Sequence, residues 1–163
     1  MKRRIRSVAA AGALLIAPAA AEAAEIGRIR VHLVYEETGR LSDDVSGWPQ
    51  MGPWNTYSGG GPAEENANDL LVLVEVIAGP EDRAGVPEGV DVVIDQPLEI
   101  RATDGEGRLI ARRRFADSLL TGDDGRVWKA LWLPQSTCAG RIRITASIGR
   151  STREAAVTLN CGE

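Results

Sequence analysis

Side chains that could act as nucleophiles, general bases or soft metal ligands are few in this chain of 163 residues. His32 is the only histidine, so a Ser-His-Asp or Cys-His arrangement would have to use it. No G-x-S-x-G segment, the usual setting of a hydrolase nucleophile, is present. A copper site would need more ligands than His32 and Met51 supply. The sequence therefore predicts no catalytic nucleophile and no metal site of this kind.

Carboxylates are abundant and gather in three pairs. Calcium prefers several oxygen ligands, and two suitably spaced carboxylates could cleave a glycosidic bond. The pairs lack the spacing of a calcium loop, and each falls at a turn, where aspartate bonds to the local backbone. We therefore favour a non-catalytic protein without metal or cofactor, and a small hydrolase using acidic residues is the alternative. The three pairs are Asp43-Asp44, Asp104 with Glu106, and Asp123-Asp124.

The first 23 residues have the order of an export signal. Four basic residues (Lys2, Arg3, Arg4 and Arg6) precede an apolar run over 8–20, and Ala21-Glu22-Ala23 matches the site that a signal peptidase cleaves. The apolar run is shorter than the roughly 20 residues that a membrane span needs. We expect 1–23 to be a cleaved signal peptide rather than an uncleaved anchor, with no transmembrane segment afterwards. The protein is then periplasmic or secreted.

The remaining residues, 24–163, have the length of a single domain. The whole chain holds 19 basic and 23 acidic residues. Removal of the signal takes away four bases and Glu22, which leaves 15 against 22 and a net charge of −7. A nucleic-acid partner would need a basic surface, so this balance argues against one.

The mature sequence is patterned like strands almost throughout. Residues 28–35 and 141–148 alternate between apolar and polar, which is typical of half-buried strands. Further strands are expected near 70–77, 90–94, 98–102, 108–115, 127–133 and 155–161. Turn sequences at 104–107, 123–125 and 149–151 separate several of them. Seven or eight short strands with regular turns predict an all-β, antiparallel β-sandwich.

The two cysteines of the mature chain fit the last predicted hairpin. A tight turn at 149–151 makes the numbers of paired residues add to about 300, and Cys138 and Cys161 add to 299. They would lie opposite each other, within reach of a disulfide. The bond would close a loop of 24 residues and stabilise the fold by about 3 kcal/mol. A redox role would prefer a C-x-x-C pair.

Three consecutive segments carry a resemblance to a known class. They read PLEIRATDGEGRLIARRRF, GDDGRVWKALWLP and GRIRITASIG. This order resembles the bacterial immunoglobulin-like modules of surface and periplasmic proteins over residues 97–160. The resemblance implies an immunoglobulin-like sandwich, and it implies adhesive, structural or partner-binding roles loosely, because fold does not fix function. Residues 36–67 have no counterpart in it.

Residues 36–67 form an unusually long connection between two predicted strands. The segment carries Trp48, Met51, Trp54 and Tyr57, whereas a disordered linker would be poor in aromatics. One interpretation is that these side chains cover a sheet face, because both faces of the strand at 127–133 are apolar. The other is that they form a binding surface for a sugar, peptide or protein partner. They are the candidate partner-binding residues.

Arg112, Arg113 and Arg114 are consecutive, and further arginines alternate along the strands near 28–30 and 141–143. Guanidinium groups in such a stripe could hold an anionic glycan or phosphate groups. The simpler alternative is a solvated strand face whose arginines discourage edge pairing. The three arginines are the candidate anion-binding residues. Overall we expect an exported β-sandwich that binds a partner protein or envelope component, with a structural or adhesive module as an alternative.

The export signal makes a direct prediction. The protein expressed with residues 1–163 in a bacterium should be recovered outside the cytoplasm, with Ala24 as its first residue. Cell fractionation and N-terminal sequencing check this. Changing Ala21 and Ala23 to leucine should block the cleavage, because the peptidase needs small residues there. Recovery of the full-length chain in the cytoplasm would contradict the export hypothesis.

Overall fold

The computed structural model describes residues 23–48, 63–116 and 118–159. Almost all regular structure in these ranges is β, and the strands pair antiparallel. The strands are β1 (Glu25–Val34), β2 (Asp69–Ile77), β3 (Val93–Ile94), β4 (Leu98–Thr103), β5 (Leu109–Phe115), β6 (Leu119–Leu120), β7 (Arg126–Leu133), β8 (Gly140–Ile148) and β9 (Ser151–Leu159). One short helix, α1 (Pro80–Arg83), lies between β2 and β3. No helix among the described residues has the length and apolarity to cross a bilayer.

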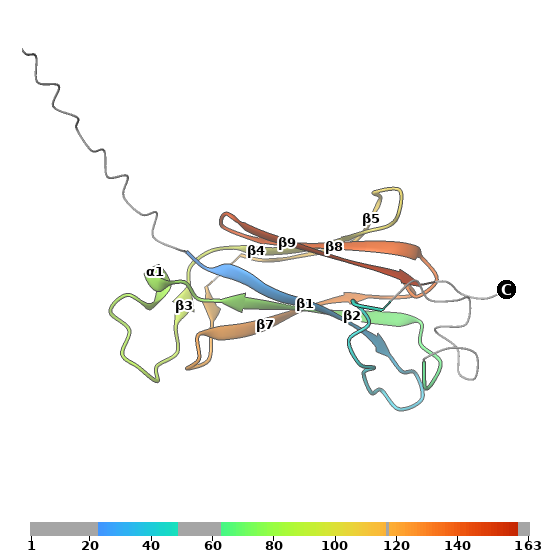
Figure 1. Ribbon diagram of the computed structural model, residues 1–163, viewed down its shortest axis with the longest axis horizontal. Helices are drawn as coiled ribbons and strands as arrows, with labels where there is room; N and C mark the ends of the chain where they lie inside the picture. The colour runs from blue at the N-terminus through green and yellow to red at the C-terminus, as the bar shows by residue number, and fades with distance from the viewer. Residues whose placement is uncertain (1–22, 49–62, 117, 160–163) are drawn as a thin grey trace, which may run out of the picture.

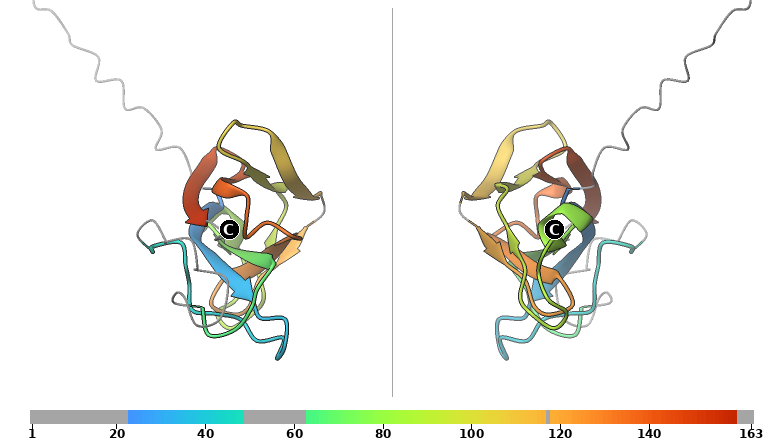
Figure 2. Two further views of the ribbon diagram at one scale, coloured as in Figure 1. Left: turned by 90° about the vertical axis from the view of Figure 1, so that its right-hand side faces the viewer. Right: turned by 90° about the vertical axis from the view of Figure 1, so that its left-hand side faces the viewer.

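The long strands form two layers (Figure 1). One sheet has the order β1-β2-β7, and the other has the order β5-β4-β8-β9. The short strands β3 and β6 pair with each other. The end-on views in Figure 2 show the two sheets on opposite sides of the interior. At one border β5 approaches β7, where Arg113 Nη1 donates to the Ala130 carbonyl at 3.2 Å.

Every second side chain of each long strand points inward, and these side chains fill the space between the two layers. In β2 the inward residues Leu70, Val72, Val74 and Val76 have no exposed surface. The opposite sheet contributes a matching row of buried isoleucines, alanine and leucine. Burial of each large aliphatic side chain contributes about 1.5–3 kcal/mol, so this shared core holds the two sheets together. The row consists of Leu98, Ile100, Ile142, Ile144, Ala146 and Ile148.

The observed strands confirm the predicted all-β pattern and differ from it mainly at their ends. The strand expected at 90–94 is reduced to Val93–Ile94, and the segment before it contains the short helix α1. β9 starts at Ser151, four residues earlier than expected. The connection is a two-residue turn in which Gly149 has a φ of +52°, so strand pairing resumes at once. Residues 151–154 are all polar, so neither face of this part of the strand is apolar, and the sequence shows no alternation there.

The hairpin between β4 and β5 shows why an acid stands at its turn. Asp104 Oδ1 accepts hydrogen bonds from the backbone N–H groups of Glu106 and Arg108, both at 2.9 Å. Its other oxygen accepts from Arg108 Nε at 2.6 Å. Arg108 and these backbone bonds together hold the pKa of Asp104 below its ordinary value, although burial opposes this. Gly107 takes a φ of +83°, as the predicted turn requires.

The described beginning of the long connection runs along the free edge of β1. The Ser42 and Val45 N–H groups donate to the carbonyls of Leu33 and Val31, at 3.0 and 2.8 Å. Asp44 Oδ1 accepts from the N–H groups of Val31 and Ser46, each at 3.0 Å. Burial opposes the ionisation of Asp44, yet these bonds outweigh it and lower its pKa. This stretch therefore shields part of an edge that could otherwise pair with another chain.

The pairing of β8 with β9 has the register that the cysteines require. Gly140 pairs with Leu159 and Ile148 with Ser151, so the paired residue numbers add to 299. Cys138 and Cys161 have the same sum. Cys161 lies outside the described residues, so the disulfide stays a prediction.

Removal of this disulfide should lower stability measurably. Under oxidising conditions, Cys161→Ser should unfold with a free energy about 3 kcal/mol smaller than the wild type, because the open chain gains entropy when unfolded. Urea denaturation followed by circular dichroism measures the difference. In excess reductant the two proteins should unfold at nearly the same urea concentration. Identical unfolding of oxidised and reduced wild type would show that no such bond exists.

Candidate functional site

The outer side of the sheet β1-β2-β7 carries the most unusual surface among the described residues. We call it the tryptophan face. Register places Leu71 of β2 opposite Trp132 of β7, and Leu73 opposite Ala130. Arginines from β1 and β7 lie toward one end of this face, the end that carries Trp128 and Glu75. The face consists of Leu71, Leu73, Trp128, Ala130 and Trp132, with Arg28, Arg30 and Arg126 at that end.

Trp132, near the end of the edge strand β7, is the large aromatic side chain most open to solvent on this face, with 46% of its surface exposed. Its indole Nε1 donates to Asp69 Oδ2 at 3.0 Å, and Asp69 Oδ1 accepts from the Gln135 N–H at 2.8 Å. The ring is therefore held in place from one edge and leaves much of its apolar surface uncovered. A large, fixed and exposed aromatic side chain is unusual unless something binds it.

Glu75 lies on the same side of the sheet but is almost fully buried, with 2% of its surface exposed. Arg28 binds both carboxylate oxygens, through Nε at 3.0 Å and Nη2 at 3.1 Å. Arg126 Nη1 donates to Oε1 at 2.9 Å. A Cβ atom at position 27 would lie 2.6 Å from Glu75 Oε2, so Gly27 leaves the space that the carboxylate occupies.

The two guanidinium groups fix the charge of this acid. The hydrogen bond from Arg28 is the largest influence on the pKa of Glu75 and lowers it, burial raises it, and the bond from Arg126 lowers it again. The result is a pKa below the ordinary glutamate value. The same contact raises the pKa of Arg28. Glu75 is therefore ionised near neutral pH and anchors two arginines at the border of the face.

Trp128 lies opposite Glu75 in the register and joins the arginines to the aromatic surface. The Arg30 guanidinium carbon lies 4.9 Å from the ring centroid, and that of Arg28 lies 5.6 Å from it. Each such cation–π contact contributes about 0.5–1 kcal/mol at an exposed site. Arg30 forms no ion pair within the described ranges. The stack therefore presents a cation beside an apolar surface.

His32 falls mid-strand beside the arginines, as the sequence predicts, and Leu71 lies opposite it. Its Nδ1 lies 2.8 Å from the carbonyl oxygen of Ser42, which can only accept, so Nδ1 carries the proton. Its Nε2, the atom that would act as a base, is buried without a hydrogen-bond partner in the described part of the chain. Among the described residues, His32 therefore has no hydrogen-bonded nucleophile beside it.

The structure describes one of the four candidate partner-binding residues. Trp48 is half-buried and packs against the core, with its N–H donating to the Val45 carbonyl at 3.1 Å. It lines a cavity of about 250 Å³ together with Tyr35 and Leu41. Met51, Trp54 and Tyr57 lie outside the described residues. Trp128 and Trp132 were missed as candidates, although two tryptophans four residues apart on one side of a strand are a usable signal.

The three consecutive arginines do not form one cluster. Arg112 and Arg114 lie on the outer side of the sheet β5-β4-β8-β9, while Arg113 pairs with the inward-facing Ile100. Arg113 reaches toward β7 and lies 4.6 Å over the Phe115 ring. The reason is the two-residue period of a strand, which sends every second side chain to the other side.

The acidic pairs hold no metal-like arrangement: within the described ranges, no three His, Cys, Asp or Glu side chains gather as a metal site would need. A cavity of about 850 Å³ is lined by the exposed acids Glu25 and Glu81 beside Arg150. Neither acid has a hydrogen-bonded partner among the described residues.

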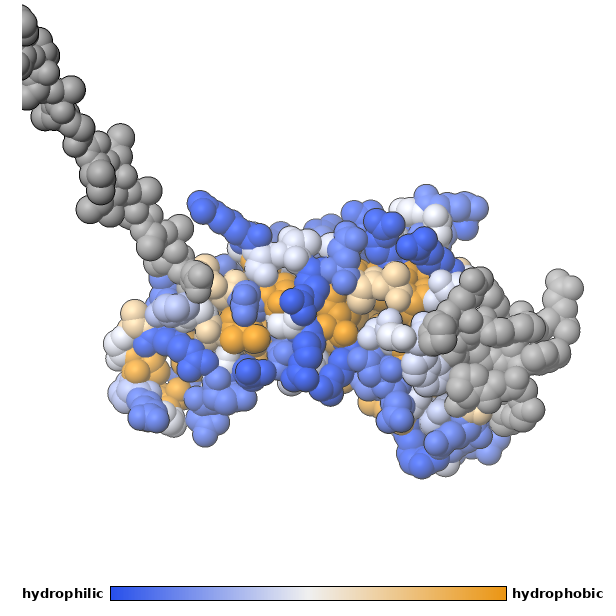
Figure 3. Space-filling model, viewed as in Figure 1, coloured by the Kyte–Doolittle hydropathy of each residue, from blue (hydrophilic) through white to orange (hydrophobic). Residues whose placement is uncertain are grey.

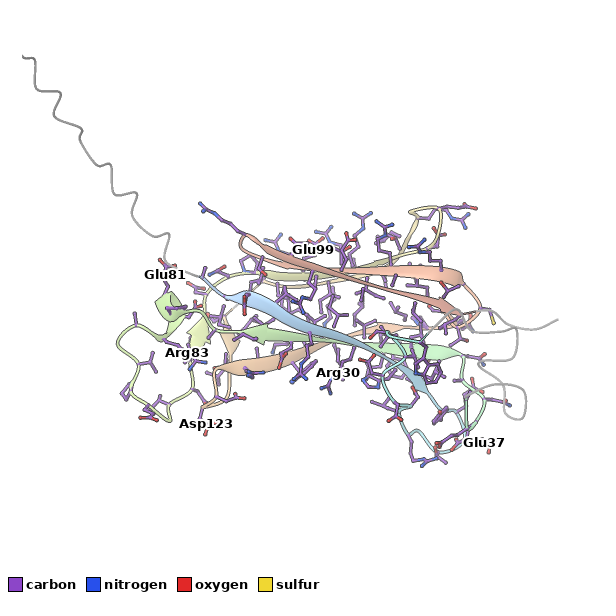
Figure 4. All side chains as sticks on the ribbon, in the orientation of Figure 1. Arg30, Glu37, Glu81, Arg83, Glu99 and Asp123 are labelled. Atoms are coloured by element: carbon purple, nitrogen blue, oxygen red, sulfur yellow. The ribbon has the colours of Figure 1, made fainter. Side chains whose placement is uncertain are left out.

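The two outer faces point away from each other. In Figure 4, Arg30 projects from the layer that contains β1, and Glu99 projects on the far side of the other layer. Figure 3 views the border between β1 and β9, where apolar surface shows between the layers and hydrophilic side chains cover the outer margins. A ligand on one face therefore leaves the other free.

No protein-family model matches the sequence, and no curated protein matches it. Among solved structures, the chain is similar to part of a β-glucuronidase of Bifidobacterium dentium complexed with coumarin-3-O-glucuronide. The identity is 14% and the TM-score is 0.39. The match covers 84% of this chain and 18% of that enzyme, so the chain corresponds to a small part of its length.

The ion pairs of Glu75 predict a pH dependence of stability. A lowered pKa in the folded state adds stability above the unfolded pKa, which is lost as the pH falls through the folded pKa. Urea unfolding at pH 7, 5, 4 and 3 should therefore show that the advantage of wild type over Glu75→Gln shrinks with acidification. At pH 7 we expect an advantage of about 1–3 kcal/mol, because charged hydrogen bonds are lost.

Glu99→Gln is the matched control. Glu99 also binds an arginine, through Arg112 Nη2 at 2.6 Å, but its side chain is 33% exposed. Solvent screens such a pair, so its removal should cost about 0–1 kcal/mol. Parallel pH profiles for wild type and Glu75→Gln would contradict the buried ion pairs.

Proposed function

We propose that this protein is an exported, non-catalytic β-sandwich of the immunoglobulin-like kind that binds a partner protein through the tryptophan face. The observation that carries the proposal is the exposed Trp132, held by Asp69 beside the apolar side chains of Leu71 and Ala130. Tryptophan and arginine are the residue types that most often dominate binding energy at protein interfaces, and this face combines them.

The geometry of the face supports binding at low entropic cost. Trp132 is held by Asp69, and Arg28 is held by the buried Glu75. Side chains that are already ordered lose little conformational freedom when a partner arrives. The half-buried Leu71 and Leu73 extend the apolar surface beside Trp132.

Charge indicates what kind of partner fits. Arg28, Arg30 and Arg126 carry three positive charges toward one end of the face, and Glu75 there and Asp69 beside Trp132 carry two negative ones, a net charge of +1. A partner with an apolar surface and acidic groups that meet the arginine end would therefore be complementary. An envelope component of the same chemistry would fit too. Trp48 and Leu41 lie where the connection borders β1, and the proposed contact extends to them.

The two alternative functions need other features. A small hydrolase needs two acids whose environments differ, and the exposed Glu25 and Glu81 offer no such difference. A structural or adhesive module needs no specific partner, and then the exposure of Trp132 has no role. The proposal differs from both in assigning a role to the face.

Photo-crosslinking in the exporting cell tests the proposal. Benzoylphenylalanine replaces Ala130 on the tryptophan face, or Ala156 on the outer side of the other sheet as the control. We expect one discrete crosslinked protein at position 130 that is absent at position 156. Trp132→Ala should reduce that product about tenfold or more, because interface hot spots contribute about 2 kcal/mol or more.

The melting temperature separates binding from folding. Trp132 is half exposed, so Trp132→Ala should shift the melting temperature only by a few degrees. The same crosslinked proteins at both positions, or no effect of Trp132→Ala on the product, would refute the proposed binding face.

A further inference from the structure

The outer side of the four-stranded sheet is a second charged surface that is independent of the tryptophan face. Register places alternate residues of β5, β4, β8 and β9 on this side. It carries five arginines and two glutamates, a net charge of +3, in a chain whose net charge is −4. We call the five arginines the arginine stripe: Arg101, Arg112, Arg114, Arg141 and Arg143.

The carboxylates on this side neutralise only part of the stripe. Glu99 binds Arg112 at 2.6 Å, and Glu154 lies 3.8 Å from Arg143. Within the described ranges the remaining three arginines have neither an ion pair nor a hydrogen-bonded side-chain partner. They are Arg101, Arg114 and Arg141.

Arg101 occupies a position that is unfavourable for folding. It lies directly opposite Arg112 in the antiparallel pair β4-β5, and like charges directly opposite each other destabilise a sheet. On its other side it pairs with Thr145, so no acid is directly opposite it there. An external anion would supply the missing negative charge. Glu99 neutralises Arg112 in this pair, so Arg101 is the cation left without a negative charge beside it.

The stripe is long rather than compact. It runs from Arg141 near the start of β8, through Arg143 and the pair Arg101–Arg112, to Arg114 on β5. These positions span the equivalent of residues 141–147 of β8, which is about 20 Å in an extended strand. A series of cations over this length matches a linear polyanion better than a single small anion.

The residues around the stripe favour one class of polyanion over the surface of an anionic membrane and over single-stranded nucleic acid. Membrane-surface segments combine basic residues with apolar anchors, but Leu109 is the one large, exposed apolar side chain on these four strands. Single-stranded nucleic acid needs aromatic rings for base stacking, and Phe115, the aromatic residue of this sheet, pairs with the inward-facing Leu98. Arginines, threonines and serine on a polar sheet face fit carboxylate or sulfate groups and hydroxyls. We propose that the arginine stripe binds a linear acidic polysaccharide.

Binding of defined polymers to the purified mature chain tests this proposal. The probes are polygalacturonate and dextran sulfate, with neutral dextran as the uncharged control. Titration calorimetry at low and high salt should show binding of one or both acidic polymers, weakened by salt, and none of dextran. Arg101→Thr should weaken binding about two- to fivefold, and Arg101→Thr with Arg114→Thr about tenfold, because each exposed charge pair contributes modestly.

Two controls keep the test specific. Arg153→Thr removes the same charge from β9, but Arg153 pairs with the inward-facing Ala146 and lies off the stripe. It should change the affinity less than twofold. Arg101→Thr should not lower the melting temperature, because it removes a like-charge contact; this separates a binding role from a structural one.

Several results would contradict the binding of acidic polysaccharide by the arginine stripe. The proposal is wrong if neither acidic polymer binds, or if Arg153→Thr weakens binding as much as Arg101→Thr. It is also wrong if vesicles of anionic phospholipid or single-stranded DNA bind more tightly than both polymers. None of these results bears on the tryptophan face, which stays intact in every variant.

Discussion

Burial of the Glu75 carboxylate on an outer sheet face is the constraint around which one side of this protein is arranged. A charged group removed from water needs several hydrogen bonds, and Arg28 and Arg126 supply them. Gly27 leaves the space for the carboxylate. Because Arg28 is held there, it also lies over Trp128, and Arg30 adds a second cation to that ring. An ordered cationic group at one end of an apolar surface follows from this one buried acid.

The two sheets share one core but differ in what they present to solvent. The sheet β1-β2-β7 exposes indole and leucine side chains beside arginines, whereas the other sheet exposes arginines among threonines and serine. Backbone alternation makes this division possible, since each strand contributes one set of side chains to the core and the other to its own outer face. If both proposals hold, the protein is a two-sided connector that holds a protein on one face and an acidic polymer on the other.

The strands and turns were predictable because they depend on local pattern. Alternation at 141–148 and the turn at Asp104–Gly107 gave the right elements, and the register of β8 with β9 has the predicted sum. The candidate site was less accessible, because it depends on which strands become neighbours. Sequence alone does not show that Glu75 meets Arg28 and Arg126, which lie 47 and 51 residues away. Consecutive arginines suggested a cluster at 112–114, but alternation turns Arg113 to the inner side.

The central claim is that the tryptophan face is ordered and open in the free protein. Hydroxyl-radical footprinting read by mass spectrometry measures this directly, because oxidation of each tryptophan reports its access to solvent. We predict that Trp132, which is 46% exposed, is oxidised at about half the rate of the urea-unfolded chain, whereas Trp128, stacked under Arg28 and Arg30, is oxidised several times more slowly. Equal protection of the two rings would contradict the account, since it would mean that another part of the molecule covers the face.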